Sequence, residues 1–350
     1  MKKIILIFIL LLLSGCKDYT EVNDLGIISG IIIDYQDNKF KITSELIIND
    51  EESNVEVLTT MSDSIDEAIK EISKLTNKKI FIPHLKVLII TDNILKNDID
   101  YYDYFLRNSK SSMNFYVYYI DSKITDKVFK LNEEKDKNAL HVEKMLQFNK
   151  QIFSSSTPLT FIDLVYKKLE YGIDIIYPVI DIIKNNDEEI LSLTNQISYK
   201  DNKFITSTEN ESITYNILTN NIDKSSITVN CDNKTFTLQI QDIKTKYKWK
   251  DNLFNINTNI NGKITDYECK YDLNDINTLK RLEKLSQNYI NDQINNLINK
   301  TKEDNNDILG MQNYIYKHDK NHNKDSININ NIKNKNNIEF NIISTGEIRK

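Results

Sequence analysis

The chain has 350 residues, of which 40% are apolar and 27% are charged, and its formal net charge is −6. This length is enough for two domains, and the apolar fraction is enough to build packed cores. The mildly acidic balance argues against nucleic-acid binding, which needs Lys and Arg clustered on one face. With seven glycines and three prolines, the chain is not expected to contain a glycine-rich phosphate loop or a proline-rich linker.

The first residues have the pattern of a secretory signal peptide. Lys2 and Lys3 precede an apolar run from Ile4 to Leu13, and small residues follow it. This arrangement predicts a signal peptide over residues 1–15. The apolar run is too short to span a bilayer, which takes ~20 residues. No other stretch of the sequence reaches that length, so no membrane-spanning helix is expected.

The signal peptide ends in Leu13-Ser14-Gly15-Cys16, which resembles the bacterial lipobox. In that motif the cysteine thiol takes a diacylglyceryl group, a peptidase cuts before the cysteine, and the new N-terminus is acylated with a fatty acid such as palmitate. We therefore expect lipid attachment at Cys16, with residues 16–24 as a polar tether. The alternative is an ordinary signal peptide in which the cysteine is incidental.

Residues 25–190 alternate strand-like and helix-like segments. Leu25–Asp34 predicts a buried strand that forms a hairpin with a second strand over Phe40–Ile48. Two further strands flank a helix, an order that favours a parallel pair. This part is predicted to be an α/β region with room for two subdomains. The other elements expected here are a helix capped by Ser64, strands over Leu85–Ile90 and Phe115–Ile120, a helix over Asp98–Arg107 between them, helices over Thr125–Leu131 and Asn138–Phe148, a helix capped by Thr157 that ends at Leu169, and an extended segment over Tyr177–Ile183.

The pattern changes near residue 190, and residues 191–350 are predicted to form an α+β domain. Residues 255, 257 and 259 are all Asn and alternate with apolar residues, as in an antiparallel sheet with one wet face. The apolar stripe of a long helix, about Asp275 to Lys302, would cover the other face. The predicted fold class is therefore mixed α+β. The strands expected here are Lys203–Ser207, Ile213–Leu218, Ile227–Asn230, Phe236–Ile240, Lys244–Trp249, Phe254–Ile260, Lys263–Tyr267, Ile327–Ile332 and Ile338–Ser344, with an irregular polar stretch over Asp304–Lys324.

The sequence offers little for catalysis. His318 and His322 have a spacing that can hold a metal on a helix, but no glutamate lies between them, and a solvated loop is favoured over a zinc site. Cys231 and Cys269 are permitted to form a disulfide in an exported protein, although their spacing slightly favours free thiols. No Gly-x-Ser-x-Gly motif is present. We expect no catalytic residues, no metal and no cofactor.

Four stretches together resemble the Ger(x)C lipoproteins, the C subunits of bacterial spore germinant receptors. The resemblance covers nearly the whole chain, with departures at Lys17, where the family has Trp, and at Tyr316–Lys324, where it has Trp and Pro. The matching stretches are the lipobox followed by Glu21–Asp34, the pair Ser64–Ala68 and Pro83–Ile90, the pair Tyr104–Arg107 and Asn114–Val117, and Asp307–Gly310 with the final Thr345-Gly346.

The resemblance implies a non-enzymatic subunit that is held by its lipid on the outer face of the spore inner membrane. There it would act beside an integral-membrane A subunit and a transporter-like B subunit to trigger germination in response to nutrients. Contact with the germinant itself is left open. Two other functions are considered from the residues alone. A solute-binding lipoprotein of an importer shares the lipobox but would show two α/β lobes, and a lipid-anchored enzyme would need motifs that the sequence lacks.

Overall fold

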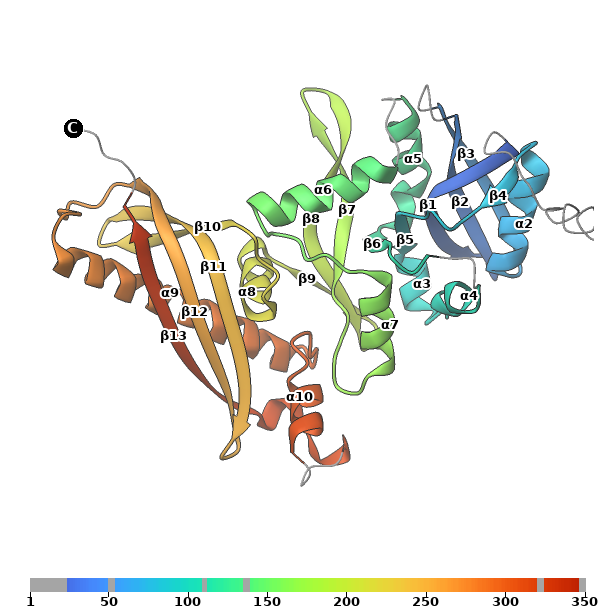
Figure 1. Ribbon diagram of the computed structural model, residues 1–350. Coiled ribbons are helices and arrows are strands. Elements are labelled where there is room, and N and C mark those ends of the chain that lie inside the picture. Colours follow the sequence, from blue (N-terminus) through green and yellow to red (C-terminus); the bar gives the residue numbers. More distant parts are fainter. Residues whose placement is uncertain (1–23, 50–53, 109–111, 135–138, 320–323, 346–350) are drawn as a thin grey trace, which may run out of the picture.

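The computed structural model describes residues 24–49, 54–108, 112–134, 139–319 and 324–345. The predicted signal peptide and Cys16 lie outside the described residues. The chain forms two β-sheets that lie at different ends of an elongated molecule, each with helices packed on it (Figure 1). Within the described residues, none of the helices is both long and apolar enough to cross a bilayer.

The larger sheet has nine strands in the order β3-β2-β1-β5-β6-β7-β8-β9, and β4 pairs with β1. Its middle strands β1, β5, β6 and β7 pair in parallel. Of these pairs, β5–β6 is the one that the strand–helix–strand order predicted. All five residues of β5 are buried, because helices cover both faces of the sheet there. The strands are β1 (Leu25–Gln36), β2 (Lys39–Asn49), β3 (Asn54–Ser62), β4 (Lys79–Phe81), β5 (Val87–Thr91), β6 (Tyr116–Ile120), β7 (Tyr177–Asn185), β8 (Glu188–Lys200) and β9 (Lys203–Ser207).

The predicted opening hairpin is present, with a tighter turn than expected. Asp37 and Asn38 alone connect β1 to β2, and both have left-handed backbone angles, with φ of 52° and 61°. Two-residue turns of this kind match the twist of the strands they join, and Asn and Asp tolerate the left-handed region. The turn predicted over residues 35–39 was therefore too long.

Helices cover the two faces of the large sheet. On one face the core contains side chains of α2, α4 and α7, and on the other it contains side chains of α5 and α6. Gly30 lies under the second group, where an added Cβ would be 2.7 Å from the Phe129 ring. This close approach explains a glycine inside a buried strand. The helices are α2 (Ile65–Leu75), α3 (Asp92–Lys96), α4 (Tyr102–Arg107), α5 (Thr125–Glu134), α6 (Ala139–Ile152) and α7 (Phe161–Leu169).

The helix starts were predicted with mixed success. Ser64 Oγ accepts a hydrogen bond from Glu67 N at 3.2 Å, so the predicted cap of α2 is confirmed. The cap predicted at Thr157 is wrong, because α7 begins at Phe161 and Thr160 accepts from Asp163 N at 3.2 Å. Thr157 is instead buried, and its hydroxyl donates to Asn216 Oδ1 at 2.6 Å.

The smaller sheet is made of β10 (Ser225–Cys231), β11 (Lys234–Lys250), β12 (Leu253–Tyr267) and β13 (Lys333–Ser344), in that order. The long helix α9 (Ile276–Glu303) packs on one face, as predicted. Its buried side chains include Leu282, Ile290, Ile294, Leu297 and Ile298. The first three strands are antiparallel, but β13 pairs in parallel with β12, which the sequence pattern did not reveal.

Several predicted elements of this half are wrong. Residues 213–218 belong to helix α8 (Glu209–Thr219) rather than to a strand. Thr208 and Glu211 form a reciprocal capping box, with each side chain accepting from the other residue's amide, and this starts the helix. The stretch predicted as irregular contains α10 (Met311–His318), and residues 329–331 form a 3-10 turn rather than a strand. The large sheet continues through β9 to Ser207, and the division at residue 190 stays a prediction.

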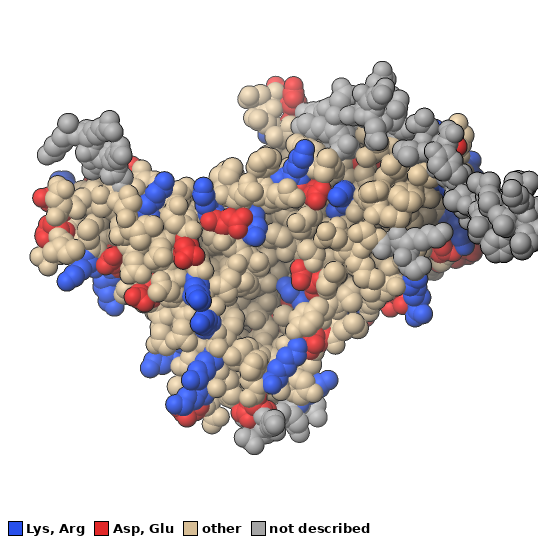
Figure 2. All heavy atoms as spheres, viewed as in Figure 1, with Lys and Arg blue, Asp and Glu red and all other residues tan. Residues whose placement is uncertain are grey.

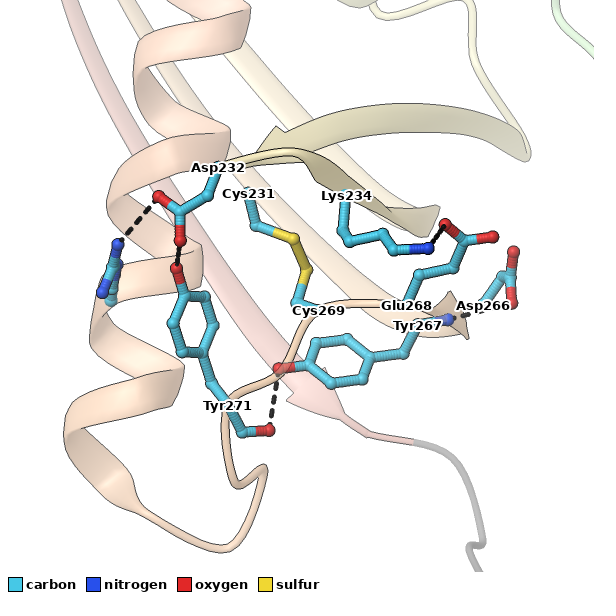
Figure 3. The surroundings of a disulfide bond; sticks show 9 residues. Cys231, Asp232, Lys234, Asp266, Tyr267, Glu268, Cys269 and Tyr271 are labelled. Carbon is cyan, nitrogen blue, oxygen red and sulfur yellow. Dashed lines mark hydrogen bonds and ion pairs between the residues drawn. A yellow bond between two sulfur atoms is a disulfide. The ribbon is translucent and has the colours of Figure 1, made fainter.

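Cys231 and Cys269 form a disulfide, which corrects the preference for free thiols (Figure 3). Sheet register explains the pairing: β12 runs beside β11 as far as Tyr267, and Glu268 N then donates to Thr235 O at 3.0 Å. Cys269 therefore lies beside the β10–β11 turn, and the two Cα atoms are 6.1 Å apart. Spacing along the sequence carries no information about this register.

The disulfide should stabilise the small sheet. Replacing both cysteines by alanine is expected to lower the free energy of unfolding by about 2–4 kcal/mol, because the unfolded chain loses a closed loop of 38 residues. Urea unfolding with and without dithiothreitol measures this, and the double variant serves as the control that the reductant should not affect. If dithiothreitol did not change the urea unfolding of the wild-type chain, the presence of the disulfide would be contradicted.

The packing of α9 makes a second prediction. Leu282 is fully buried against the small sheet, so Leu282→Ala should lower the free energy of unfolding by about 2–5 kcal/mol. Lys280 is exposed on the same helix, and Lys280→Ala should change stability by less than ~0.5 kcal/mol. Equal thermal shifts for the two variants would show that α9 is not docked through Leu282.

Candidate functional site

A cleft of about 920 Å³ lies where the two sheet-bearing halves meet. Its walls come from α3 and the segment after it, α7, the linker 170–176, the β8–β9 turn and the loop between α9 and α10. The walls combine tyrosines with charged and amide side chains. Such a lining suits a polar small molecule better than an apolar one.

Ion pairs cross between the elements that form the cleft. Lys168 on α7 lies 3.0 Å from Asp98, and Lys200 at the end of β8 lies 2.8 Å from Asp174 in the linker. These charges are partly exposed, so each pair contributes little to stability. Their effect is geometric, because each pair holds two separate elements in register.

The linker and the α9–α10 loop are interlocked by reciprocal hydrogen bonds. Asp174 N donates to Asp307 O at 2.9 Å, and Asp307 N donates to Asp174 Oδ2 at 2.7 Å. The Asp307 carboxylate in turn accepts from Met311 N at 2.9 Å and from Gln312 N at 2.8 Å. It thus satisfies amide groups at the start of α10 that would otherwise lack partners. We call this set of contacts the junction.

Two glycines make the junction close enough to form. Gly172 in the linker has φ of +67°, and an added Cβ would lie 2.7 Å from Gln312 Cβ. Gly310 ahead of α10 has φ of +66°, and its Cβ would lie 2.9 Å from Ile173. Each glycine therefore faces a residue of the opposite segment in a left-handed conformation that side chains disfavour. Gly310 ends the Asp307–Gly310 stretch noted in the sequence, and Gly172 was not singled out there.

Burial sets the protonation of the junction. Removal from water raises the pKa of Asp307 to about 7, and the amide hydrogen bonds from Gln312 and Met311 oppose that rise. Burial also raises the pKa of Tyr177, at the back of the cleft, to about 12, so it stays neutral. A perturbed carboxyl can mark a functional site, but structural networks perturb pKa values too. The contacts of Asp307 are those of a helix cap.

Cys16 and His322 lie outside the described residues. The His318 ring stacks on Tyr314 at a centroid distance of 4.0 Å, and its Nδ1 lies 2.8 Å from Tyr314 O. Among the described residues, no group of three or more His, Cys, Asp or Glu is arranged to hold a metal ion. The walls of the cleft carry charged and amide side chains from both halves.

Comparisons with known proteins fit this two-part architecture. The family described as "Spore germination protein N-terminal domain" matches residues 18–182. The family described as "Spore germination B3/GerAC like, C-terminal" matches residues 197–349. The chain belongs to the Ger(x)C family. It is thus a C subunit of the spore germinant receptor type. The junction joins a segment of the first matched region to a loop of the second.

Two relatives show how far the likeness extends. "Spore germination protein A3" of Bacillus subtilis (strain 168) is 22% identical over 275 residues, which cover 73% of this chain and 71% of that protein. The solved structure titled "Crystal Structure of the GerBC protein" has a TM-score of 0.52 and 17% identity, and the match covers 90% of this chain and 97% of that chain. At this identity the structural match shows a shared fold, the mixed α+β architecture predicted from the sequence.

The raised pKa of Asp307 gives the junction a pH dependence. In an unfolded chain this carboxyl titrates near pH ~3.9. Between about pH 4 and pH 7 the folded chain therefore binds a proton that the unfolded chain lacks, and stability from this group falls as pH rises through about 7. Asp307→Asn should flatten that fall. Urea unfolding on either side of this window measures it, with exposed Asp201→Asn as the control. If the stability of the Asp307→Asn variant fell with pH as steeply as that of the Asp201→Asn variant, the raised pKa of Asp307 would be contradicted.

Proposed function

We propose that this chain is a lipid-anchored, non-enzymatic subunit of a nutrient germinant receptor. A diacylglyceryl group on Cys16 would hold it at the outer face of the spore inner membrane. There it would act with integral-membrane A and B subunits to trigger germination. The observation that carries the proposal is the family match over both halves, which begins at residue 18, two residues after the lipobox cysteine.

Other features support an exported chain without catalysis. The disulfide between Cys231 and Cys269 suits an oxidising compartment outside the cytosol. The cleft has paired charges on its walls and no metal-binding group among the described residues. An importer's solute-binding lipoprotein would have two similar α/β lobes, whereas a nine-stranded mixed sheet here adjoins a four-stranded one. That alternative is the weaker one.

The tether limits where the folded body can be. From Cys16 to Leu25 the chain advances nine residues (25 − 16 = 9), which reach at most about 30 Å when fully extended. Diacylglycerol buries many methylene groups at ~0.8 kcal/mol each, so a lipidated chain should rarely leave the bilayer. The body would therefore meet partners in or on that membrane at a high local concentration.

The anchor is tested by changing its chemistry and its length. Cys16→Ala should abolish labelling by a fatty-acid analogue and severely reduce nutrient-triggered dipicolinate release from spores. Inserting about ten Gly/Ser residues after Lys17 should reduce release only mildly, because local concentration falls slowly with tether length. Protein levels are matched by immunoblot.

Each outcome bears on a different part of the proposal. Unchanged labelling of Cys16→Ala would mean that Cys16 is not the lipid site. Normal germination without the gene, across a nutrient panel, would remove the receptor function. A long-tether variant as inactive as Cys16→Ala would mean that the tether fixes an orientation rather than a local concentration.

A further inference from the structure

The outer face of the small sheet carries a concentrated positive charge. Cross-strand register places Lys248, Asn255 and Lys335 in one row, and Lys250, Leu253 and Lys333 in the next row towards the β11–β12 turn. Lys246 follows two residues from Lys248 on the same face, because side chains alternate along a strand. We call Lys246, Lys248, Lys250, Lys333 and Lys335 the lysine face.

This face is the one that α9 leaves uncovered. Tyr247 and Trp249 alternate with these lysines and point inward, where they pack against the core under α9. All five lysines are exposed. Figure 1 shows β12 and β13 in front of α9, and Figure 2 shows lysine side chains gathered over the same strands. The face is therefore open to a partner.

The lysines are largely unpaired. Within the described part of the chain, Lys250 alone among the five forms an ion pair, with Asp251 at 3.8 Å. The rows between the lysines are filled by neutral amides, such as Asn337 Nδ2 donating to Asn257 Oδ1 at 2.9 Å. The acids of this face, Asp242 and Glu339, lie further along the strands, away from the β11–β12 turn. A chain of net charge −6 thus has a cationic surface among its described residues.

We propose that the lysine face is a docking surface for the anionic headgroups of a lipid bilayer. Exposed lysines are attracted to anionic headgroups across a Debye length, without any shaped pocket. The uncovered sheet face presents them as a two-dimensional array that many headgroups of one membrane surface can approach together. This deepens the proposed membrane location, and it adds a second contact that is independent of the lipid on Cys16.

The composition of the face favours lipid over an acidic protein. Protein interfaces take their energy from buried aromatic residues and Arg, and they are depleted of Lys. Asparagines lie between the lysines of the lysine face, and Leu253 lies between Lys250 and Lys333 near the β11–β12 turn. Trp249 and Tyr247 are turned inward and unavailable to a partner. Positive charge without an aromatic or Arg anchor residue fits attraction to anionic lipid headgroups better than docking of a protein.

The two membrane contacts would fix the orientation of the body. In Figure 1, β1, which follows the tether, lies at one end of the molecule, and β11, β12 and β13 lie at the other. An anchor at one end alone would let the body swing about the tether. A second contact at the far end would lay the molecule along the bilayer and present the same surface to every membrane partner.

Vesicle binding tests the proposal on the chain from Lys17 onward, which lacks the predicted signal peptide and Cys16. Sedimentation with phosphatidylcholine–phosphatidylglycerol vesicles should show binding that weakens as salt rises, and phosphatidylcholine vesicles alone should show none. Lys246→Gln with Lys248→Gln should weaken binding about 30-fold, which corresponds to about 2 kcal/mol at ~1 kcal/mol per lysine. Charge reversal of both to Glu should weaken it further.

The matched control uses the opposite side of the same half. Lys280→Glu with Lys284→Glu changes net charge as much as Lys246→Glu with Lys248→Glu, but these lysines are exposed on α9. The control should leave binding within about twofold, and thermal unfolding confirms that all variants fold. An equal loss of vesicle binding in both double variants would overturn the proposal, because the net charge of the protein would then explain the binding without the lysine face.

Two further results would also overturn it. If the unlipidated chain did not bind anionic vesicles at low salt, the proposal would be overturned. This result does not depend on lipid attachment at Cys16, so the two proposals can fail separately. Binding of an acidic peptide such as polyglutamate, lost in the Lys246/Lys248 variants while vesicles stay unbound, would assign the face to an acidic protein instead.

Discussion

The junction between the linker and the α9–α10 loop is the constraint on which the rest of the arrangement depends. The halves have separate cores, and the chain passes from one to the other between β9 and α8. The paired hydrogen bonds of Asp174 and Asp307, closed by Gly172 and Gly310, help to fix their relative position. Further hydrogen bonds between the halves, such as Thr157 to Asn216 and Asn306 to Ser198, support the same arrangement. Gly172 and Gly310 allow a backbone approach that a Cβ would block, and Asp307 links that approach to the start of α10.

The cleft is a consequence of this junction. Its walls belong to both halves, so its shape exists only while they hold their relative position. Lys200 binds Asp174, which makes the junction part of the cleft wall rather than a separate feature. A molecule bound there would contact both halves. It would change how the halves sit relative to each other only if it bound one of their arrangements more tightly than another. Charged pairs on the walls are the contacts that such a molecule would displace.

The sequence predicted elements well where local patterns decide them. The α2 cap at Ser64, the parallel β5–β6 pair and the buried stripe of α9 follow from capping chemistry and periodicity. The prediction failed at residues 213–218 because apolar β-branched residues suggested a strand. The capping box of Thr208 and Glu211, which lies just upstream, was not recognised. That signal was in the sequence and outweighs the propensity of the residues that follow.

Other features depend on register, which no local pattern contains. The disulfide follows from β12 running beside β11 until Cys269 reaches the β10–β11 turn. The lysine face arises in the same way: β11 and β13 are separated by some eighty residues in the sequence, yet Lys248 and Lys335 share a row. Net charge is a sum over all residues and is negative here, so composition alone could not reveal a local cluster of lysines.

The junction also gives the lysine face a mechanical meaning. A tether of this length restricts the distance of the body from the bilayer but not its direction. If the two halves moved freely, a contact at the small sheet would fix only that half, and the large sheet could still turn. Because Asp174, Asp307 and the facing glycines hold the halves together, one electrostatic contact at the small sheet orients the whole chain. The cleft would then face a fixed direction relative to the membrane, which is the condition for a subunit that must present one surface to membrane-embedded partners.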